Sequence, residues 1–131
     1  MAEREEHLKA AQAALQAGDF ALGHKLSEEL IAANPGDSEA LYLAAVAARY
    51  VERFDEADKH LAALHRLTPE YGRAWQEEGH LALAKGDASR ALDAFARATR
   101  FNPVLAASWR EQARLLVQMG RNEEALSLIH I

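Results

Sequence analysis

Three prolines divide the chain at regular intervals. Pro35, Pro69 and Pro103 lie 34 residues apart, twice in succession. The same period relates Phe20 to Phe54, Trp75 to Trp109, Gly86 to Gly120, and Ala57 to Ala91 and Ala125, and twice the period relates Gly18 to Gly86. A fixed period of this length indicates a stack of similar supersecondary units, so this repeat constrains the fold more than any other feature of the sequence.

The composition favours helix along the whole chain. There are 29 alanines, against only nine valines, isoleucines and threonines together. Alanine loses no side-chain entropy in a helix, whereas β-branched residues lose χ1 freedom there. We therefore expect an all-α protein.

Glycine and proline predict where the helices end. Gly18, Gly86 and Gly120 fall where the first helix of a pair should stop, because glycine takes the left-handed C-cap conformation at low steric cost. The three prolines close the second helices, since proline disfavours helix in the residue before it. Glu52 occupies the glycine position in the second repeat, so we expect its turn to be strained or differently built. The expected helices are 4–17, 20–33, 38–51, 54–67, 72–85, 88–101, 106–119 and 122–131.

The repeat unit resembles that of the tetratricopeptide family. The third repeat carries the pattern most clearly, with Trp75, Gly79, Ala91, Phe95 and Pro103. The resemblance covers residues 4–131 in about 3.7 repeats, which we place at 4–37, 38–71, 72–105 and, truncated, 106–131. It implies a single domain that forms a right-handed α-solenoid of antiparallel helical hairpins, with an inner groove lined by the first helix of each pair.

Small and aromatic residues mark the expected packing positions. Small residues let the two helices of a pair approach closely, and they are Ala11, Ala45, Gly79 and Ala113 in the first helices and Ala57, Ala91 and Ala125 in the second. The resemblance places Trp75 and Trp109 at an inter-helix packing position, so we interpret both indoles as core.

Charge and composition exclude several classes of function. The net charge of −5 argues against general affinity for nucleic acid or anionic membranes, which reward clustered Lys and Arg. The absence of cysteine excludes disulfides and thiol chemistry. The charged N-terminus has no apolar core, and the longest apolar run, residues 40–48, is too short to span a bilayer. We expect a cytoplasmic protein.

No motif for catalysis, metal binding or cofactor binding is present. The six histidines show no H-E-x-x-H spacing and have no cysteine partners, so we interpret them as ordinary helix residues. The serines lack a G-x-S-x-G context, and the glycines stand singly. The adjacent Glu77 and Glu78 are expected to be solvated charges on different helix faces. We predict no catalytic residues, no metal site and no cofactor.

The resemblance also implies which residues face the groove. The family contacts its ligands through the second, fifth, ninth, twelfth and thirteenth positions of each repeat. Those that we expect to bind a partner are Tyr42, Val46, Arg49, Tyr50, Arg73, Gln76, His80, Arg110 and Arg114. Tyrosine and arginine are enriched at binding hot spots, and arginines offer paired donors to carboxylates. We therefore predict a protein or peptide partner with acidic groups. In the alternative, the arginines pair with Glu77, Glu78 and Glu111 along the helices and merely solvate a face.

Two hypotheses of function and a third, structural one remain open. The first is a protein-interaction scaffold. The second is an N-terminal regulatory or substrate-presenting segment of a longer bacterial enzyme, such as a sulfotransferase or glycosyltransferase, because such segments have similar Asn-Pro and Ala-Ala-Trp stretches (here 102–103 and 106–109). The third is a packing unit without a groove ligand. We expect the apolar residues Leu126, Ile129 and Ile131 to be uncovered, either because the chain is a fragment of a longer array or because two copies meet end to end. In either case we expect self-association through the C-terminal helix.

Overall fold

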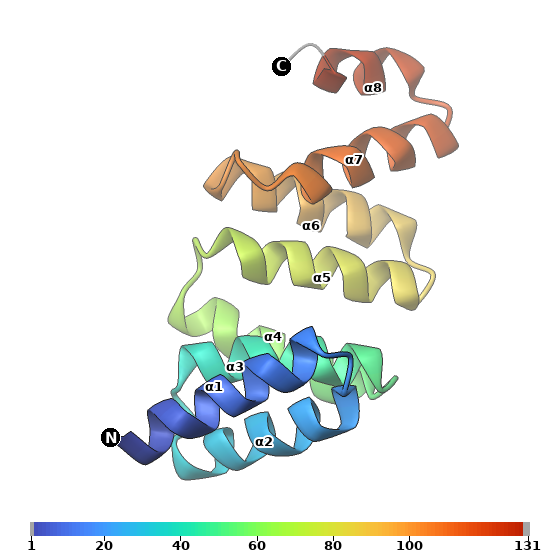
Figure 1. The fold of residues 1–131 in the computed structure, drawn as a ribbon. Helices are drawn as coiled ribbons and strands as arrows, with labels where there is room; N and C mark the ends of the chain where they lie inside the picture. Colours follow the sequence, from blue (N-terminus) through green and yellow to red (C-terminus); the bar gives the residue numbers. More distant parts are fainter. Residues whose placement is uncertain (1, 130–131) are drawn as a thin grey trace. The chain divides into compact units, whose positions relative to one another are not determined.

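The computed structural model describes residues 2–129, and in that range it contains eight α-helices and no strand (Figure 1). The helices are α1 (Ala2–Gln16), α2 (Phe20–Ala33), α3 (Ser38–Tyr50), α4 (Phe54–Leu67), α5 (Gly72–Ala84), α6 (Ala88–Phe101), α7 (Ala106–Gln118) and α8 (Asn122–Ile129). The first seven begin and end within two residues of their predicted bounds, so the all-α prediction is confirmed. None of the helices in this range has the length and apolarity that crossing a bilayer requires.

One type of turn ends the first helix of each hairpin. The glycines at its tip have left-handed backbones, and they are Gly18 (φ 83°), Gly86 (φ 78°) and Gly120 (φ 76°). At the second of them, the Gly86 amide donates to the carbonyl of Leu83 at 3.0 Å and the Asp87 amide donates to that of Ala82 at 2.8 Å. These two bonds form a Schellman motif, which satisfies carbonyls that the helix end leaves open.

Glu52 adopts the same turn without being glycine. Its φ is 62°, and its amide donates to the carbonyl of Arg49 at 3.1 Å. The Arg53 amide donates to the carbonyl of Ala48 at 2.7 Å, as in the glycine turns. The turn is thus built like the others, and its left-handed L-residue costs about 1–2 kcal/mol of backbone strain.

Relieving this strain should stabilise the protein. We expect Glu52→Gly to raise the free energy of unfolding by about 1 kcal/mol. The relief of strain at the positive φ should exceed the cost of ordering glycine, which has more conformational freedom in the unfolded chain. Urea unfolding followed by circular dichroism measures the change. Glu52→Ala is the control, since it removes the charge but keeps the Cβ atom. An equal gain from the alanine variant would assign the effect to the carboxylate instead of the backbone.

The second helices end two residues before the prolines, as predicted. The intervening cap residues are Asn34, Thr68 and Asn102, and the amide of each donates to the carbonyl four residues earlier. The side-chain oxygen Oδ1 of Asn34 also accepts a hydrogen bond from the Gly36 amide, at 3.1 Å. These contacts turn the chain sharply into the next hairpin.

Aspartates begin several of the helices. The side chains of Asp19, Asp37 and Asp87 accept hydrogen bonds from the backbone amides of the first turns of α2, α3 and α6. Each bond satisfies one of the donors that a helix N-terminus leaves open. The position equivalent to Asp19 in the second hairpin is Arg53, which makes no side-chain cap.

The helices fall into two compact halves, which we describe separately. The N-terminal half, residues 1–69, holds α1 to α4, and the C-terminal half, residues 70–131, holds α5 to α8. In the N-terminal half each helix packs against the next, and α1 also contacts α3. In the C-terminal half α5 packs on α6, α6 on α7, and α7 on α8.

Each half has its own apolar core. In the N-terminal half, buried Leu8, Leu30 and Leu43 cluster with alanines of α1 and α3. In the C-terminal half, Phe95 and Leu115 cluster with Ala82 and Ala91. The predicted small packing residues are buried in both halves, except Ala113, which is half-buried.

Three side chains differ from their predicted surroundings. Trp75 and Trp109 are half-buried, so their assignment to the core is wrong. The Trp109 indole donates to the carbonyl of Pro103 at 2.8 Å, and the Arg97 guanidinium lies 4.8 Å from the centre of the Trp75 ring. Glu77 is only 4% exposed, so its assignment as a solvated charge is wrong as well.

Candidate partner-binding surface

The predicted contact residues lie on the first helices of the hairpins, and in each half these helices are neighbours. In the N-terminal half, α1 contacts α3 directly. In the C-terminal half, the Ser108 hydroxyl on α7 donates to Oε1 of Gln76 on α5 at 2.7 Å. Each half therefore presents a two-helix surface that carries part of the predicted set.

In the N-terminal half, the predicted residues form a mostly apolar and aromatic surface on α3. Tyr42 and Val46 are half-buried, and the Tyr42 side chain packs against the core. Tyr50 is 49% exposed and stacks on Phe20, with ring centroids 4.0 Å apart and ring planes 3° apart. The Arg49 guanidinium lies 4.4 Å from the centre of the Tyr50 ring. These contacts hold Tyr50 as a flat, half-exposed platform.

In the C-terminal half, two predicted arginines are exposed, and the charge of one of them, Arg110, helps to lower the pKa of Glu111. Arg73 lies near the start of α5, one turn before Gln76, and Arg110 lies on α7, two residues after Ser108. Neither guanidinium forms a hydrogen bond or an ion pair within the described part of the chain. Both can therefore accept a carboxylate from outside without breaking a bond inside the protein.

Arg114 is in a different state, because it is already paired. Its Nε and one terminal nitrogen donate to the two carboxylate oxygens of Glu111, at 3.1 and 2.5 Å. These hydrogen bonds are the main cause that holds the pKa of Glu111 below its usual range. The positive charges of Arg114, His80 and Arg110 lower this pKa further, whereas desolvation of the carboxylate raises it. Arg114 thus pairs along its helix, as the predicted alternative describes. Arg73 and Arg110 form no such ion pair within the described part of the chain.

Gln76 and His80 contribute to packing within the C-terminal half. The Gln76 side chain is half-buried and bonded to Ser108, as above. The His80 ring is half-buried and meets Phe95 edge to face, with centroids 5.2 Å apart. Gln76 and His80 thus have packing contacts within this half, whereas Arg73 and Arg110 are exposed, and the role of all four in binding a partner stays a prediction.

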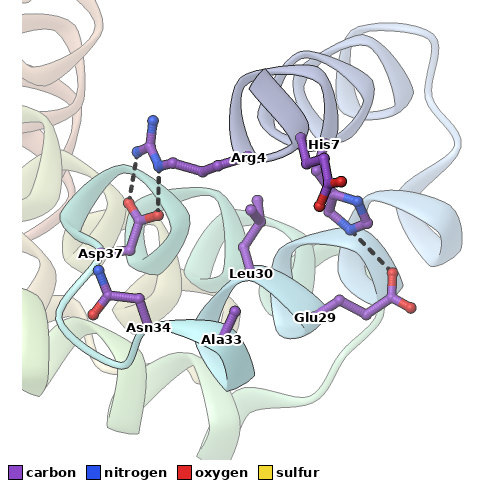
Figure 2. A pocket seen from close by; sticks show the side chains of 8 residues that line it. Arg4, His7, Glu29, Leu30, Ala33, Asn34 and Asp37 are labelled. Atoms are coloured by element: carbon purple, nitrogen blue, oxygen red, sulfur yellow. Dashed lines mark hydrogen bonds and ion pairs between the residues drawn. The ribbon is translucent and has the colours of Figure 1, made fainter. Parts of the chain in front are cut away.

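The N-terminal half also holds a cavity that the sequence did not predict (Figure 2). It has a volume of about 460 Å³ and lies between α1, α2 and the start of α3. Figure 2 shows Arg4 and Asp37 on one side and the His7–Glu29 pair on the other, with Leu30 between them. Arg4 is paired with Asp37 and His7 with Glu29 across this rim, at 2.9–3.0 Å.

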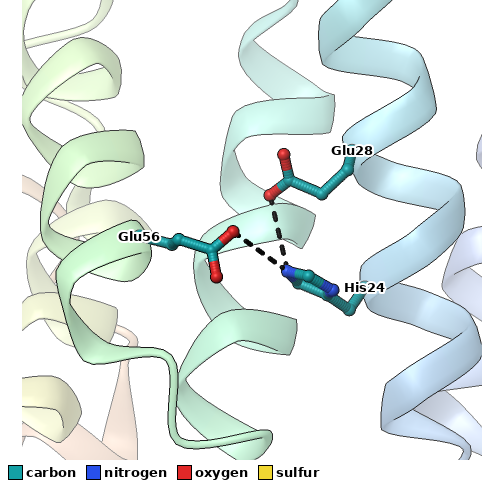
Figure 3. A group of neighbouring side chains, drawn as sticks. All are labelled: His24, Glu28 and Glu56. Carbon is teal, nitrogen blue, oxygen red and sulfur yellow. Dashed lines mark ion pairs between the residues drawn. The ribbon is translucent and has the colours of Figure 1, made fainter.

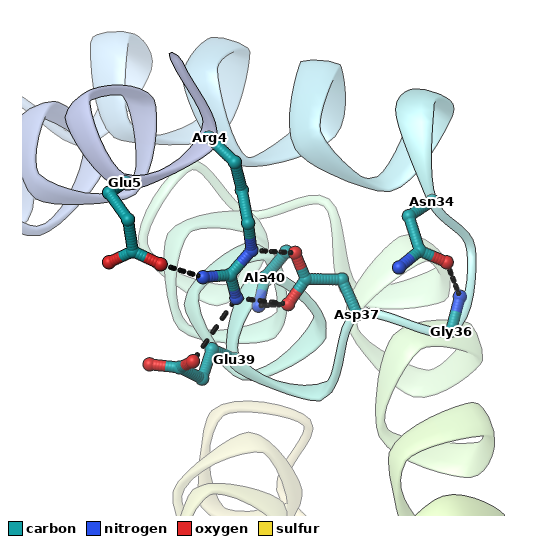
Figure 4. Close-up of polar contacts among 7 residues, drawn as sticks. All are labelled: Arg4, Glu5, Asn34, Gly36, Asp37, Glu39 and Ala40. Atoms are coloured by element: carbon teal, nitrogen blue, oxygen red, sulfur yellow. Dashed lines mark hydrogen bonds and ion pairs between the residues drawn. The ribbon is translucent and has the colours of Figure 1, made fainter. Parts of the chain in front are cut away.

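A network around Arg4 joins α1 to the start of α3 (Figure 4). The Arg4 guanidinium donates to both carboxylate oxygens of buried Asp37, at 2.9 and 3.0 Å, and also contacts Glu5 and Glu39. The same Asp37 carboxylate accepts from the Ala40 amide at 3.2 Å. The hydrogen bonds from Arg4 are the main cause that lowers the pKa of Asp37. No repeat marker points to this pair, because Arg4 has no arginine at the equivalent position of the other repeats.

The lowered pKa of Asp37 predicts a specific dependence of stability on acid. A carboxyl with a depressed folded-state pKa stabilises the fold above its unfolded pKa, about 3.9, and this contribution is lost as the pH falls through the folded value. We expect the free energy of unfolding to fall less steeply below about pH 4 in Arg4→Ala than in the wild type. Urea titrations at several pH values measure the slopes. Lys9→Ala, on the same helix, should keep the wild-type slope, and a wild-type slope in Arg4→Ala would contradict the prediction.

The residues predicted to mediate self-association are only partly described. Leu126 on α8 is 56% exposed, as an uncovered apolar side chain would be. Ile129 ends the helix, but its side chain and Ile131 lie outside the described residues. Self-association through these residues stays a prediction.

Comparisons with known proteins agree on the architecture. A family model described as tetratricopeptide repeat matches residues 8–57, 44–106 and 77–129. The same fold occurs in MamA 41-end from Desulfovibrio magneticus RS-1, with a TM-score of 0.83 and 15% identity over 97% of this chain and 72% of that one. It also occurs in the thermophilic TPR protein TTC0263 of Thermus thermophilus, with a TM-score of 0.82 and 21% identity over 97% of this chain and 71% of that one. Another crystal structure of MamA gives a TM-score of 0.85 and 17% identity over 95% of this chain and 73% of that one. No curated protein sequence matches the chain.

Proposed function

Because the chain belongs to the tetratricopeptide repeat family, we propose that it is a protein-interaction scaffold that binds an extended acidic segment of a partner protein. Proteins of this family bind protein partners and are generally scaffolds without catalytic activity. The observation that carries the acidic specificity is the exposure of Arg73 and Arg110. Among residues 2–129 neither guanidinium forms a hydrogen bond or an ion pair, although the chain as a whole has a net charge of −5.

The charges of the C-terminal half favour such a ligand. A planar guanidinium presents two parallel N–H donors to a carboxylate, so Arg73 and Arg110 can each hold one acidic side chain. Arg114 is a third candidate, but its release from Glu111 costs a charge-assisted pair, so we assign it a smaller contribution. In the N-terminal half, the Tyr50 platform with Phe20 offers a flat apolar contact for the same kind of segment.

The test is a binding titration with extended peptides of matched length. We expect a peptide rich in Asp and Glu to bind more tightly than its Asn/Gln counterpart, and a Lys-rich peptide to bind least. The double variant Arg73→Glu/Arg110→Glu should weaken the acidic peptide about tenfold or more, since two charge-assisted contacts become repulsive. Added salt should weaken binding as well, because these contacts are exposed. Fluorescence anisotropy of labelled peptides measures the affinities.

The control is a variant with the same change in charge on other helices. Arg66→Glu/Arg100→Glu alters two exposed arginines at the ends of the second helices α4 and α6. It should leave the affinity near that of the wild type. Equal loss in both double variants would assign the effect to net charge and remove Arg73 and Arg110 from the site. Equal affinity for acidic and neutral peptides would refute the acidic specificity.

A further inference from the structure

Two helices of the N-terminal half bring a histidine and two glutamates together (Figure 3). His24 and Glu28 belong to α2, and Glu56 belongs to the first turn of α4. Nε2 of His24 lies 3.7 Å from Oε1 of Glu28 and 3.5 Å from Oε1 of Glu56. All three side chains are half-buried, and their nearest ligand atoms lie within 4.8 Å of one another.

A fourth group completes the cluster from α4. Nε2 of buried His60 lies 2.6 Å from Oε1 of Glu28, within hydrogen-bond distance. Both helices therefore contribute one His and one Glu at a spacing of four residues, which places the two side chains on the same helix face. The order is reversed between the helices, so each histidine faces a glutamate of the other helix.

The distances around His24 are those of neighbouring metal ligands. Its Nε2 atom is buried and makes no hydrogen bond within the described part of the chain. Separations of 3.5 and 3.7 Å are too long for hydrogen bonds of ordinary strength. Two ligands bound at about 2.0–2.1 Å to a tetrahedral zinc ion lie about 3.3–3.4 Å apart. Small shifts of the side chains would therefore place all three groups on one ion.

The cluster is not a consequence of the repeat. In α6, the residues two repeats after His24 and Glu28 are Leu92 and Ala96, which cannot bind a metal. A helix hairpin thus forms without these ligands, and among residues 2–129 such a His–Glu group occurs only in the N-terminal half. Sequence patterns with H-E-x-x-H or Cys/His spacing miss it, because each helix supplies only a His–Glu pair.

We propose that the N-terminal half binds one first-row divalent metal ion of the Zn²⁺ class through His24, Glu28 and Glu56. Imidazole ligands favour Zn²⁺ and its neighbours over Mg²⁺ and Ca²⁺, which prefer ligand sets made of oxygen. His60 donates its Nε2 proton to Glu28 and orients that carboxylate, as supporting residues around metal ligands commonly do. The ion would join α2 to α4 and so stabilise the N-terminal half. This proposal is independent of the acidic peptide site.

Calorimetric titration of the untagged full chain with Zn²⁺, after removal of metals with EDTA, tests the proposal. We expect one Zn²⁺ per chain and an affinity that falls about tenfold or more in His24→Gln and in Glu56→Gln. His7→Gln is the matched control, because His7 also faces a glutamate, Glu29 at 3.0 Å, but belongs to no group of three such ligands among the described residues. It should bind like the wild type.

Thermal unfolding gives a second measurement. Zn²⁺ should raise the unfolding midpoint of the wild type and of His7→Gln, because a ligand of the folded state stabilises it, and should leave His24→Gln unchanged. Circular dichroism checks that each variant is folded. If His24→Gln does not fold, Glu56→Gln serves as the test variant, because Glu56 is the more exposed of the two ligands. No saturable binding by the wild type, or equal affinity in His24→Gln, Glu56→Gln and His7→Gln, would overturn the proposal.

Discussion

Replacing Phe95 with alanine is expected to lower the free energy of unfolding of the C-terminal half by about 3–5 kcal/mol. The ring is fully buried and packs with Ala82, Ala91 and Leu115. Its neighbours on α5 and α7 are held by their own helices, so they cannot close the space that the ring leaves. The loss therefore includes both the lost burial of the ring and the remaining cavity.

Urea unfolding followed by tryptophan fluorescence measures this loss of stability in the C-terminal half. Both tryptophans, Trp75 and Trp109, belong to the C-terminal half, so their emission reports on its unfolding. Val104→Ala is the control, because Val104 is 82% exposed and its change should stay within about 0.5 kcal/mol. A loss below about 1 kcal/mol in Phe95→Ala would show that the half repacks around the missing ring.

The helix bounds could be predicted from the sequence because their causes are local. Glycine at positions such as Gly86 permits the left-handed turn, and a proline two residues beyond a helix stops it, whatever the rest of the chain does. The turn at Glu52 shows the limit of this reasoning. The repeat imposed the same backbone on a residue that disfavours it, because the hydrogen bonds of the helix end outweigh about 1–2 kcal/mol of strain.

The state of the surface side chains could be predicted only in part. The pairing of Arg114 with Glu111 follows from their spacing of three residues on one helix. The Arg4–Asp37 pair and the His24–Glu56 contact join residues more than thirty positions apart, so no local pattern contains them. Burial was misjudged at Trp75 and Glu77 for a related reason. The exposure of a helix face depends on which neighbouring helix covers it, and spacing alone does not determine that.

The contact between Gly79 and Phe95 gives the second prediction of a large effect. A Cβ atom at Gly79 would lie 2.6–2.8 Å from three atoms of the Phe95 ring, far inside van der Waals contact. The ring is fully buried and packs against Ala82, Ala91 and Leu115, so its neighbours limit how far it can move aside. We expect Gly79→Val to lower the free energy of unfolding of the C-terminal half by about 3 kcal/mol, the upper part of the range for overpacked cores.

The two substitutions should compensate each other when they are combined. In the Phe95→Ala background, the space left by the ring can accept the valine side chain at Gly79, so the same substitution should cost less than about 1 kcal/mol. The four chains of this double-mutant cycle are compared by urea unfolding with tryptophan fluorescence, and we expect a favourable coupling of about 2–3 kcal/mol. The pair Gly79→Val and Val104→Ala is the additive control, because Val104 is exposed and should not couple. Additive losses at Gly79 and Phe95 would mean that the helices separate around the valine, and that the close approach of α5 to α6 does not depend on the glycine.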